Sequence, residues 1–253
     1  MIDLGFTQVL VSALLVAIAI GVSLWWKIPV QKDMALGSVR AFVQLVAVGY
    51  ALKYIFELES IPLILLVILV MILVAAHAAS GMVKKLKASM LIMFVSITVG
   101  SIVTLGLLLL LDIITWEARY VIPLAGMIIS NSMNASALTA NRVVSDIRGN
   151  APAIESALAL GKTWREASHP FQKQAAIAGL LSTLNFLKTV GIVALPGAMT
   201  GMILAGAEPV KAVLLQIIVA FMLLSAVTIT SVMTLELTVR RFFTSAHQLI
   251  DGQ

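Results

Sequence analysis

The chain has no cysteine among its 253 residues, and only 11% of its side chains are charged. The absence of cysteine excludes disulfide bonds, thiolate metal sites and cysteine nucleophiles. The low charged fraction excludes an ordinary soluble domain, in which about 25% of residues carry a charge. Hydrophobic residues make up 60% of the chain, and its mean hydropathy is +1.06. This composition predicts an all-α integral membrane protein.

The chain contains many long apolar runs. About seven of them reach or approach the roughly 20 residues that a helix needs to cross the hydrocarbon core. They lie at residues 4–26, 34–56, 61–80, 90–111, 120–141, 174–195 and 212–236. No linker rich in Pro, Ser or Gly and no internal repeat separates them. We therefore expect a single polytopic domain over residues 1–253.

The lysines and arginines fall mainly on alternate loops between these runs. One side of the expected membrane carries 12 of the 17 basic residues, and the other side carries four. The residues on the richer side are Lys27, Lys32, Lys84, Lys85, Lys87, Arg142, Arg148, Lys162, Arg165, Lys173, Arg240 and Arg241. Cytoplasmic loops carry an excess of Lys and Arg, so this pattern predicts an external N-terminus and a cytoplasmic C-terminus. The net charge of +5 thus reflects topology and not a nucleic-acid partner.

Residues 142–173 form the longest polar segment, which the topology places in the cytoplasm. Within it, residues 152–161 have the pattern of a short helix, because proline is favoured in a first turn and glycine after a last turn. A small apolar ridge with one carboxylate on such a helix is suited to a groove on a separate protein. The residues expected to dock are Pro152, Ile154, Glu155, Leu158 and Gly161. The alternative is an amphipathic helix that rests on the bilayer surface.

Polar residues within the membrane runs are candidate site residues, since each is costly to place in lipid. The fifth run has polar side chains concentrated after Gly126, and it is expected to line a pathway for a metal or polar ligand. Its candidates are Met127, Ser130, Asn131, Met133 and Asn134. The alternative role for small polar residues is helix packing. The pattern defines no fixed metal coordination sphere.

Two further features fall in other runs. Arg40 and Gln44 lie four residues apart in the second run and share a helix face. Arg40 is expected to contact substrate, to pair with another ion or to snorkel toward the cytoplasmic surface. Residues 196–209 are rich in Gly and Pro, which favours a re-entrant or broken helix near the external face over a plain turn.

Four segments together resemble a known family. Residues 38–45, 123–134, 154–161 and 195–201 are similar, in the same order, to the Fet-type bacterial iron-export ABC permeases and to the related plant aluminium-tolerance half-transporters. The family pattern has a glycine where this chain has Ser130. The resemblance implies a permease subunit in the bacterial inner membrane, paired with a second copy and with a separate ATPase that binds ATP. It implies iron export, with no cofactor and no catalytic residue on this chain.

Other transport functions remain open at the level of the sequence. Plant relatives are linked to a sugar nucleotide, so a non-metal solute is one alternative. A secondary transporter or channel without an ATPase is another. Against it, the apolar runs contain no central carboxylate of the kind that couples transport to protons.

Overall fold

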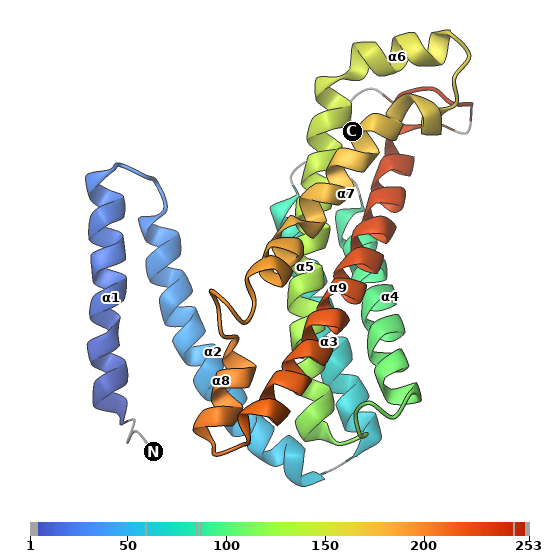
Figure 1. Ribbon diagram of the computed structural model, residues 1–253. Coiled ribbons are helices and arrows are strands. Elements are labelled where there is room, and N and C mark those ends of the chain that lie inside the picture. Colours follow the sequence, from blue (N-terminus) through green and yellow to red (C-terminus); the bar gives the residue numbers. More distant parts are fainter. Residues whose placement is uncertain (1–4, 59, 84–85, 87, 245, 251–253) are drawn as a thin grey trace. The chain divides into compact units, whose positions relative to one another are not determined.

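A computed structural model describes residues 5–58, 60–83, 86, 88–244 and 246–250. These residues form nine α-helices, one short 3-10 helix and two isolated β-bridges (Figure 1). The prediction of an all-α protein is therefore confirmed for the described part of the chain. Of the basic residues used to predict topology, Lys84, Lys85 and Lys87 lie outside it.

The chain forms two compact units, Met1–Glu59 and Ser60–Gln253. The first unit is a hairpin of α1 (Phe6–Trp25) and α2 (Gln31–Leu58). Its turn is held by the side chain of Gln31, whose Nε2 donates to the carbonyl of Ile28 at 2.6 Å, and by the hydroxyl of Ser23, which donates to the same carbonyl at 3.0 Å. The chain thus divides into two compact units, and the single domain over residues 1–253 stays a prediction.

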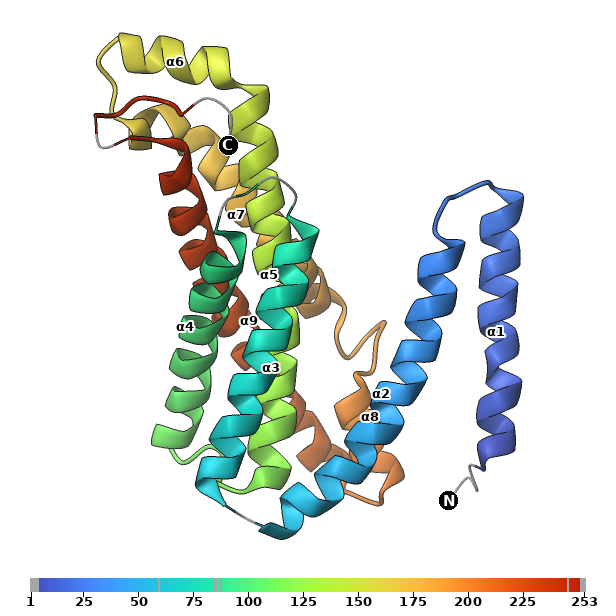
Figure 2. The ribbon, with the colours of Figure 1, turned by 180° about the vertical axis from the view of Figure 1, so that it is seen from behind.

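The second unit is a helical bundle in which successive long helices run in alternate directions (Figures 1 and 2). The long helices are α3 (Ile61–Met82), α4 (Ser89–Leu110), α5 (Ala118–Gly149), α7 (Trp164–Thr189) and α9 (Pro209–Val239). The short helix α6 (Ala151–Ala159) crosses one end of the bundle, and α8 (Gly197–Leu204) lies toward the opposite end. α5 packs against α3, α4, α7 and α9 and thus forms the centre of the unit.

Small and hydroxyl-bearing residues hold these helices close together. A Cβ atom on Gly100 of α4 would overlap the hydroxyl of Thr230 on α9. That hydroxyl donates to the hydroxyl of Ser132 on α5 at 3.1 Å, in a fully buried position. Gly179 of α7 lies as closely against Thr139 of α5. Small residues at such contacts allow backbones to approach, as is typical of helix association in membranes.

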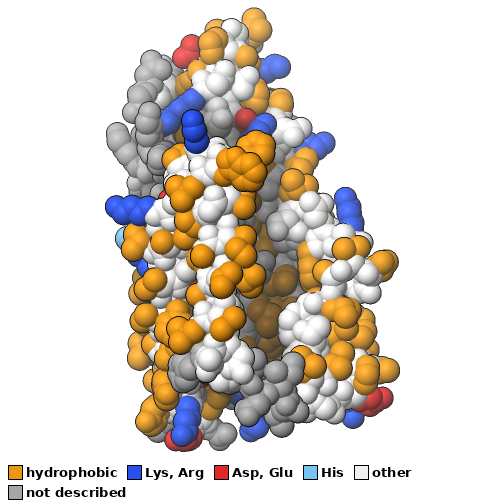
Figure 3. All heavy atoms as spheres, turned by 90° about the vertical axis from the view of Figure 1, so that its left-hand side faces the viewer, with side chains coloured by type: hydrophobic (Ala, Val, Ile, Leu, Met, Phe, Trp, Pro, Cys, Tyr) orange, Lys and Arg blue, Asp and Glu red, His pale blue; other side chains and the backbone are white. Residues whose placement is uncertain are grey.

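Six helices in the described residues are long and apolar enough to cross a membrane: α1, α2, α3, α4, α5 and α9. Hydrophobic side chains run along the helices of the face in Figure 3, and acidic side chains lie toward its two ends. α7 covers most of the sixth expected run, residues 174–195, but falls outside this set, because polar residues lower its hydropathy. Its role as a span stays a prediction.

The predicted polar segment 142–173 is largely helical. α5 continues beyond the predicted run, from residue 141 to Gly149, and α7 begins at Trp164 and not near residue 174. The ends of these two helices were misplaced because hydropathy shows where a helix leaves apolar surroundings. It does not show where the helical hydrogen bonds end. The extensions of α5 and α7 carry α6 beyond the apolar part of the bundle.

Candidate functional site

A cavity of about 340 Å³ lies between α5, α7, α8 and α9, and we call it the amide cavity. α5 contributes Met127 and Asn131, α7 contributes Thr183, and α9 contributes Gln216. Residues 196–198, at the start of α8, form another part of the wall. The cavity lies entirely within the second unit. Two of the predicted pathway residues, Met127 and Asn131, are thus brought together with residues that follow them in the chain by more than 50 positions.

Two amide side chains define the polar part of this cavity. The Nδ2 of Asn131 donates to the backbone carbonyl of Met127 at 2.8 Å, which leaves its Oδ1 as an acceptor. Gln216 is only 6% exposed, and its Oε1 has no hydrogen-bond partner in the described part of the protein. An unpaired buried polar atom is costly, and in a native structure it calls for an explanation such as a ligand or a bound water. We take the amide cavity as the candidate substrate site.

The remaining predicted pathway residues lie elsewhere. Ser130 and Asn134 are exposed on α5 and Met133 is half-buried, and among the described lining residues of the amide cavity none of the three occurs. The 100° steps along α5 distribute the five residues over more than one face, and the prediction that Ser130, Met133 and Asn134 line a substrate pathway stays a prediction. Arg40 and Gln44 belong to α2 of the first unit, where both are exposed, and their role stays a prediction.

Sequence reasoning missed Gln216 and Thr183. Gln216 is the one glutamine in the last apolar run, and a lone amide at membrane depth is itself a signal. Thr183 carries little signal, because threonine is common in packed membrane helices. Neither residue is near the fifth run in sequence, so only the fold places them beside Asn131.

The lining of the amide cavity is uncharged: among the described residues that form it, none is Lys, Arg, His, Asp or Glu. Likewise, within the part of the chain that the structure describes, no group of three or more His, Cys, Asp or Glu side chains is arranged to hold a metal ion. The cavity therefore presents uncharged amide and hydroxyl groups and the thioether of Met127. Such uncharged groups bind a ligand more weakly and more reversibly than charged side chains do.

A second candidate site lies at the opposite end of the bundle, where α6 is held between two sharp turns. Gly161 has a φ of +86° and follows α6, and its N–H donates to the carbonyl of Leu158 at 2.9 Å. The N–H of Lys162 donates to the carbonyl of Ala157 at 3.2 Å, which completes a Schellman turn. This conformation favours glycine, because a Cβ atom is strained at positive φ.

The next helix, α7, begins with a capping box. The Oγ1 of Thr163 accepts from the N–H of Glu166 at 3.3 Å, and the Glu166 carboxylate accepts from the N–H of Thr163 at 2.8 Å. These hydrogen bonds from Thr163 hold the pKa of Glu166 below its usual value. The stabilisation is present above the ordinary carboxyl pKa and is lost as the pH falls through the lowered one. The cap is therefore intact at neutral pH.

The C-terminal segment packs beside α6 and the start of α7. Trp164 stacks on Phe243 with ring centroids 5.7 Å apart, and the Nδ1 of His247 accepts from the N–H of Trp164 at 3.3 Å. Glu236, near the end of α9, accepts from both Arg165 and Arg240 at 2.8 Å. These contacts tie the start of α7 to the end of α9.

Together these elements enclose a groove of about 560 Å³, which we call the α6 groove. Glu155, Leu158 and Gly161, three of the predicted docking residues, line it on one side. Residues 246–249 line it on the other. Pro152 lies outside the groove but is exposed on α6.

Ile154 was predicted to dock a partner, and this prediction is wrong. Its side chain is fully buried beneath α6, in a part of the unit where α6 contacts α5 and α7. A helical repeat places residue 154 on the inner face of a helix whose outer face carries Glu155. Ile154 therefore anchors α6 and offers nothing to a partner.

Replacing Ile154 with alanine is expected to loosen α6, since an Ile→Ala change in a core costs about 2 to 5 kcal/mol. Hydrogen exchange of the protein in detergent should show faster exchange over residues 151–159. The matched control is Leu160→Ala, because Leu160 is 84% exposed. Equal exchange in the two variants would contradict the anchoring role.

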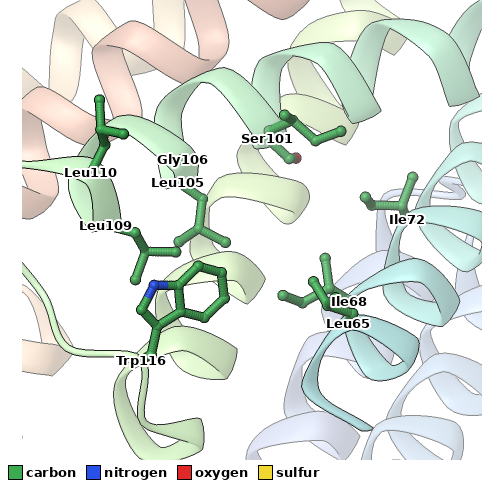
Figure 4. A pocket seen from close by; sticks show the side chains of 10 residues that line it. Leu65, Ile68, Ile72, Ser101, Leu105, Gly106, Leu109, Leu110 and Trp116 are labelled. Atoms are coloured by element: carbon green, nitrogen blue, oxygen red, sulfur yellow. The ribbon is translucent and has the colours of Figure 1, made fainter. Parts of the chain in front are cut away.

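A third cavity, of about 470 Å³, lies between α3 and α4 and has a different character. Figure 4 shows Trp116 at one end of it, with Leu105 and Leu109 on one side and Leu65 and Ile68 on the other. Its lining is almost entirely hydrocarbon, which matches lipid chains and not a polar substrate. We do not assign it to transport.

The chain is similar to proteins from bacteria and plants. It is 39% identical over 242 residues to the probable iron export permease protein FetB of Escherichia coli strain K12, covering 96% of this chain and 93% of that protein. It is 36% identical over 248 residues to the membrane protein STAR2 of Oryza sativa subsp. japonica, covering 98% and 87%. It is 35% identical over 245 residues to the protein ALUMINUM SENSITIVE 3 of Arabidopsis thaliana, covering 97% and 90%. No solved structure gives a significant match.

These similarities extend over nearly the whole length of the chain and of its relatives. The model of the uncharacterised protein family UPF0014 matches residues 6–243, which include both candidate sites apart from residues 246–249. Several members are named as membrane proteins, in agreement with the apolar helices of this fold. The predicted resemblance to the Fet-type permeases and to the plant aluminium-related proteins is confirmed, and the chain is a multi-pass membrane protein that belongs to the UPF0014 family.

Proposed function

We propose that the chain is the permease subunit of an ABC transporter that exports iron from the cytoplasm with the help of a separate ATPase. The observation that carries the proposal is the arrangement of α6, an exposed helix anchored by Ile154 across one end of the bundle. A partner that pushes on α6 would move α5 and α7 together, because both contact it. Iron as the substrate is supported by the name of the E. coli relative.

The contacts of α6 give this movement a route to the amide cavity. α5 continues from the α6 end to Asn131, and α7 continues from Trp164 to Thr183. α5 has no proline between these points, so a displacement at one end is transmitted along its hydrogen-bonded turns, whereas Pro170 removes one backbone hydrogen bond of α7. ATP bound by the partner would supply the energy, and this chain would supply the pathway.

α7 is proposed as a further span, which brings the total from six to seven. It runs between α5 and α9 and contacts both, and its buried stripe includes Ala175, Gly179 and Thr183. α5 and α9 run in the same direction, so the chain between them must cross back in the opposite direction, and α7 does so. With seven spans, the positive-inside pattern favours an external N-terminus and places α6 in the cytoplasm of a bacterial cell, with the protein in the inner membrane.

A second copy of the permease is proposed to complete the transporter. Ser130 and Asn134 are exposed on α5 at the depth of the apolar helices. Polar side chains at this depth face protein or water and not lipid. Two permeases would then work with two ATPases.

A secondary transporter is the competing function. Proton coupling within a membrane requires a carboxylate shielded from bulk water. Among the residues whose burial the structure describes, the buried polar side chains are Ser, Thr and Gln, with no Asp or Glu. This favours an energy source outside the chain.

The test is ATP-dependent accumulation of radiolabelled ferrous iron in inverted membrane vesicles under anaerobic conditions. Vesicles containing the chain and its candidate ATPase should accumulate iron, and vesicles containing either protein alone should not. Accumulation by the chain alone would contradict the proposal and favour a secondary transporter. ATP hydrolysis without iron movement would contradict iron as the substrate.

A further inference from the structure

We infer that α8 is a gate on the amide cavity, which moves on two glycine turns and opens the cavity toward the end of the bundle opposite to α6. This inference rests on the proposed transport function and adds to it the point at which the substrate leaves. It is carried by the break between α7 and α8, by the few contacts that hold α8, and by the part that α8 takes in the wall of the cavity.

The helical path of α7 is interrupted before the end of the bundle. α7 ends at Thr189, and α8 begins at Gly197, nearer to the end opposite to α6 (Figures 1 and 2). Between them, the N–H of Gly191 donates to the carbonyl of Ala194 at 2.9 Å and forms a turn. In transporters, broken helices of this kind occur where irregular backbone lines a cavity. Residues 196–198 line the amide cavity in the same way.

α8 is held more loosely than the long helices of the bundle. Over its described length, none of its residues is buried, and the helix on which it packs most is α9. The hydroxyl of Thr200 donates to the carbonyls of Pro196 and Gly197, so it serves α8 itself and joins no other helix. Elements with few buried contacts open locally at a low cost in free energy. α8 can therefore move while the bundle stays folded.

Glycine turns on both sides of α8 provide the hinges. Gly191 precedes α8 with a φ of +84°, and Gly206 follows it with a φ of +94°. The N–H of Gly206 donates to the carbonyl of Ile203, and the N–H of Ala207 donates to the carbonyl of Met202, both at 3.0 Å. This Schellman turn fixes the angle at which the chain leaves α8 for α9. Glycine adopts positive and negative φ about equally, so the angle can change.

Movement of α8 would uncover side chains deep in the cavity. Thr183 of α7 lines the cavity together with residues 196–198, and in the structure it is only 6% exposed. A displacement of α8 removes its first residues from this wall. The accessibility of residue 183 to an aqueous reagent therefore reports the position of the gate.

The test is the labelling rate of a single cysteine by a charged maleimide, in the purified protein in nanodiscs. The natural chain has no cysteine, so Thr183→Cys provides the one thiol. Gly206→Ala, made in this background, strains the turn that holds α8 in place, because a residue with a Cβ atom is unfavourable at positive φ. It should raise the labelling rate at residue 183 by about fivefold, since the open state gains population.

The matched control is Gly201→Ala, within α8, where a Cβ atom would meet nothing within 4 Å and φ is not positive. This change should leave the labelling rate at residue 183 as it is. Equal labelling rates in the Gly206→Ala and Gly201→Ala variants would overturn the gate. A second reporter, Ser132→Cys, is fully buried in the bundle and should stay unlabelled in both variants. Labelling there to the same extent as at residue 183 would show that the whole bundle opens, which also overturns the gate.

Iron accumulation in vesicles then separates this inference from the proposed function. Gly206→Ala should lower ATP-driven accumulation, since a gate that stays open lets the substrate return. If ATP drives accumulation but labelling at residue 183 does not depend on Gly206, the gate is wrong and the transport function stands. If labelling depends on Gly206 but ATP drives no accumulation, the gate stands and the transport function is wrong.

Discussion

Replacing Gly179 with alanine is expected to destabilise the bundle by about 2 kcal/mol, and replacing it with leucine by more. A Cβ atom at this position would overlap the hydroxyl of Thr139 and would lie 2.8 Å from the hydroxyl of Ser231 and 3.1 Å from the carbonyl of Ala135. The last of these is a backbone atom of α5, which cannot rotate away. α7 would have to separate from both α5 and α9.

The measurement is the midpoint of heat-induced aggregation in detergent, which should fall by about 5 °C for Gly179→Ala. Gly106 of α4 provides the matched control, because a Cβ atom there would meet nothing within 4 Å. Gly106→Ala should raise stability by about 0.5 to 1 kcal/mol, since alanine favours a helix more than glycine does. A Gly179→Ala variant as stable as the wild type would contradict the close packing of α7.

Glu155→Lys is expected to abolish ATP-dependent iron accumulation while leaving membrane insertion and ATP hydrolysis by the partner intact. Glu155 is exposed on α6 and lines the α6 groove, so it is available to a partner protein. Reversal of a charge at a complementary interface typically costs several kcal/mol of binding energy. The loss of contact would uncouple the two subunits.

The measurement compares iron accumulation with ATP hydrolysis in the same inverted vesicles. Glu208→Lys is the control, because Glu208 is an exposed carboxylate that precedes α9 at the end opposite to α6. Its ion pair with Lys211, at 3.8 Å, is exposed and contributes little. Normal iron accumulation in the Glu155→Lys variant would contradict the assignment of α6 as the docking helix.

The position of α6 shows where sequence patterns were reliable. Pro152 and Gly161 predict a short helix at residues 152–161, and the structure has α6 at Ala151–Ala159. These signals are local, because caps and turns depend on the conformation of a few neighbouring residues. The face of the helix was harder to predict. Ile154 and Leu158 share a side of the helix in sequence, but only contact with α5 and α7 shows that Ile154 is inside.

The amide cavity, in contrast, shows where sequence patterns were not sufficient. Met127 and Asn131 were found from the polar character of the fifth run, but Ser130, Met133 and Asn134 have the same character and do not line the amide cavity in the described structure. Gln216 lies in another run, and a sequence pattern carries no information on which helices meet. Distant residues become neighbours only when the helices pack.

The sequence by itself determined the membrane class, the helices and the family, because these depend on composition, local hydrogen bonding and similarity along the whole chain. The tertiary structure decided which polar residues share a cavity and which face of α6 is exposed. It also placed residues 246–249 beside α6, a contact that no local pattern predicts. The physical reason is that helix formation is governed by neighbours in sequence, whereas a site is formed by side chains that packing brings together from separate helices.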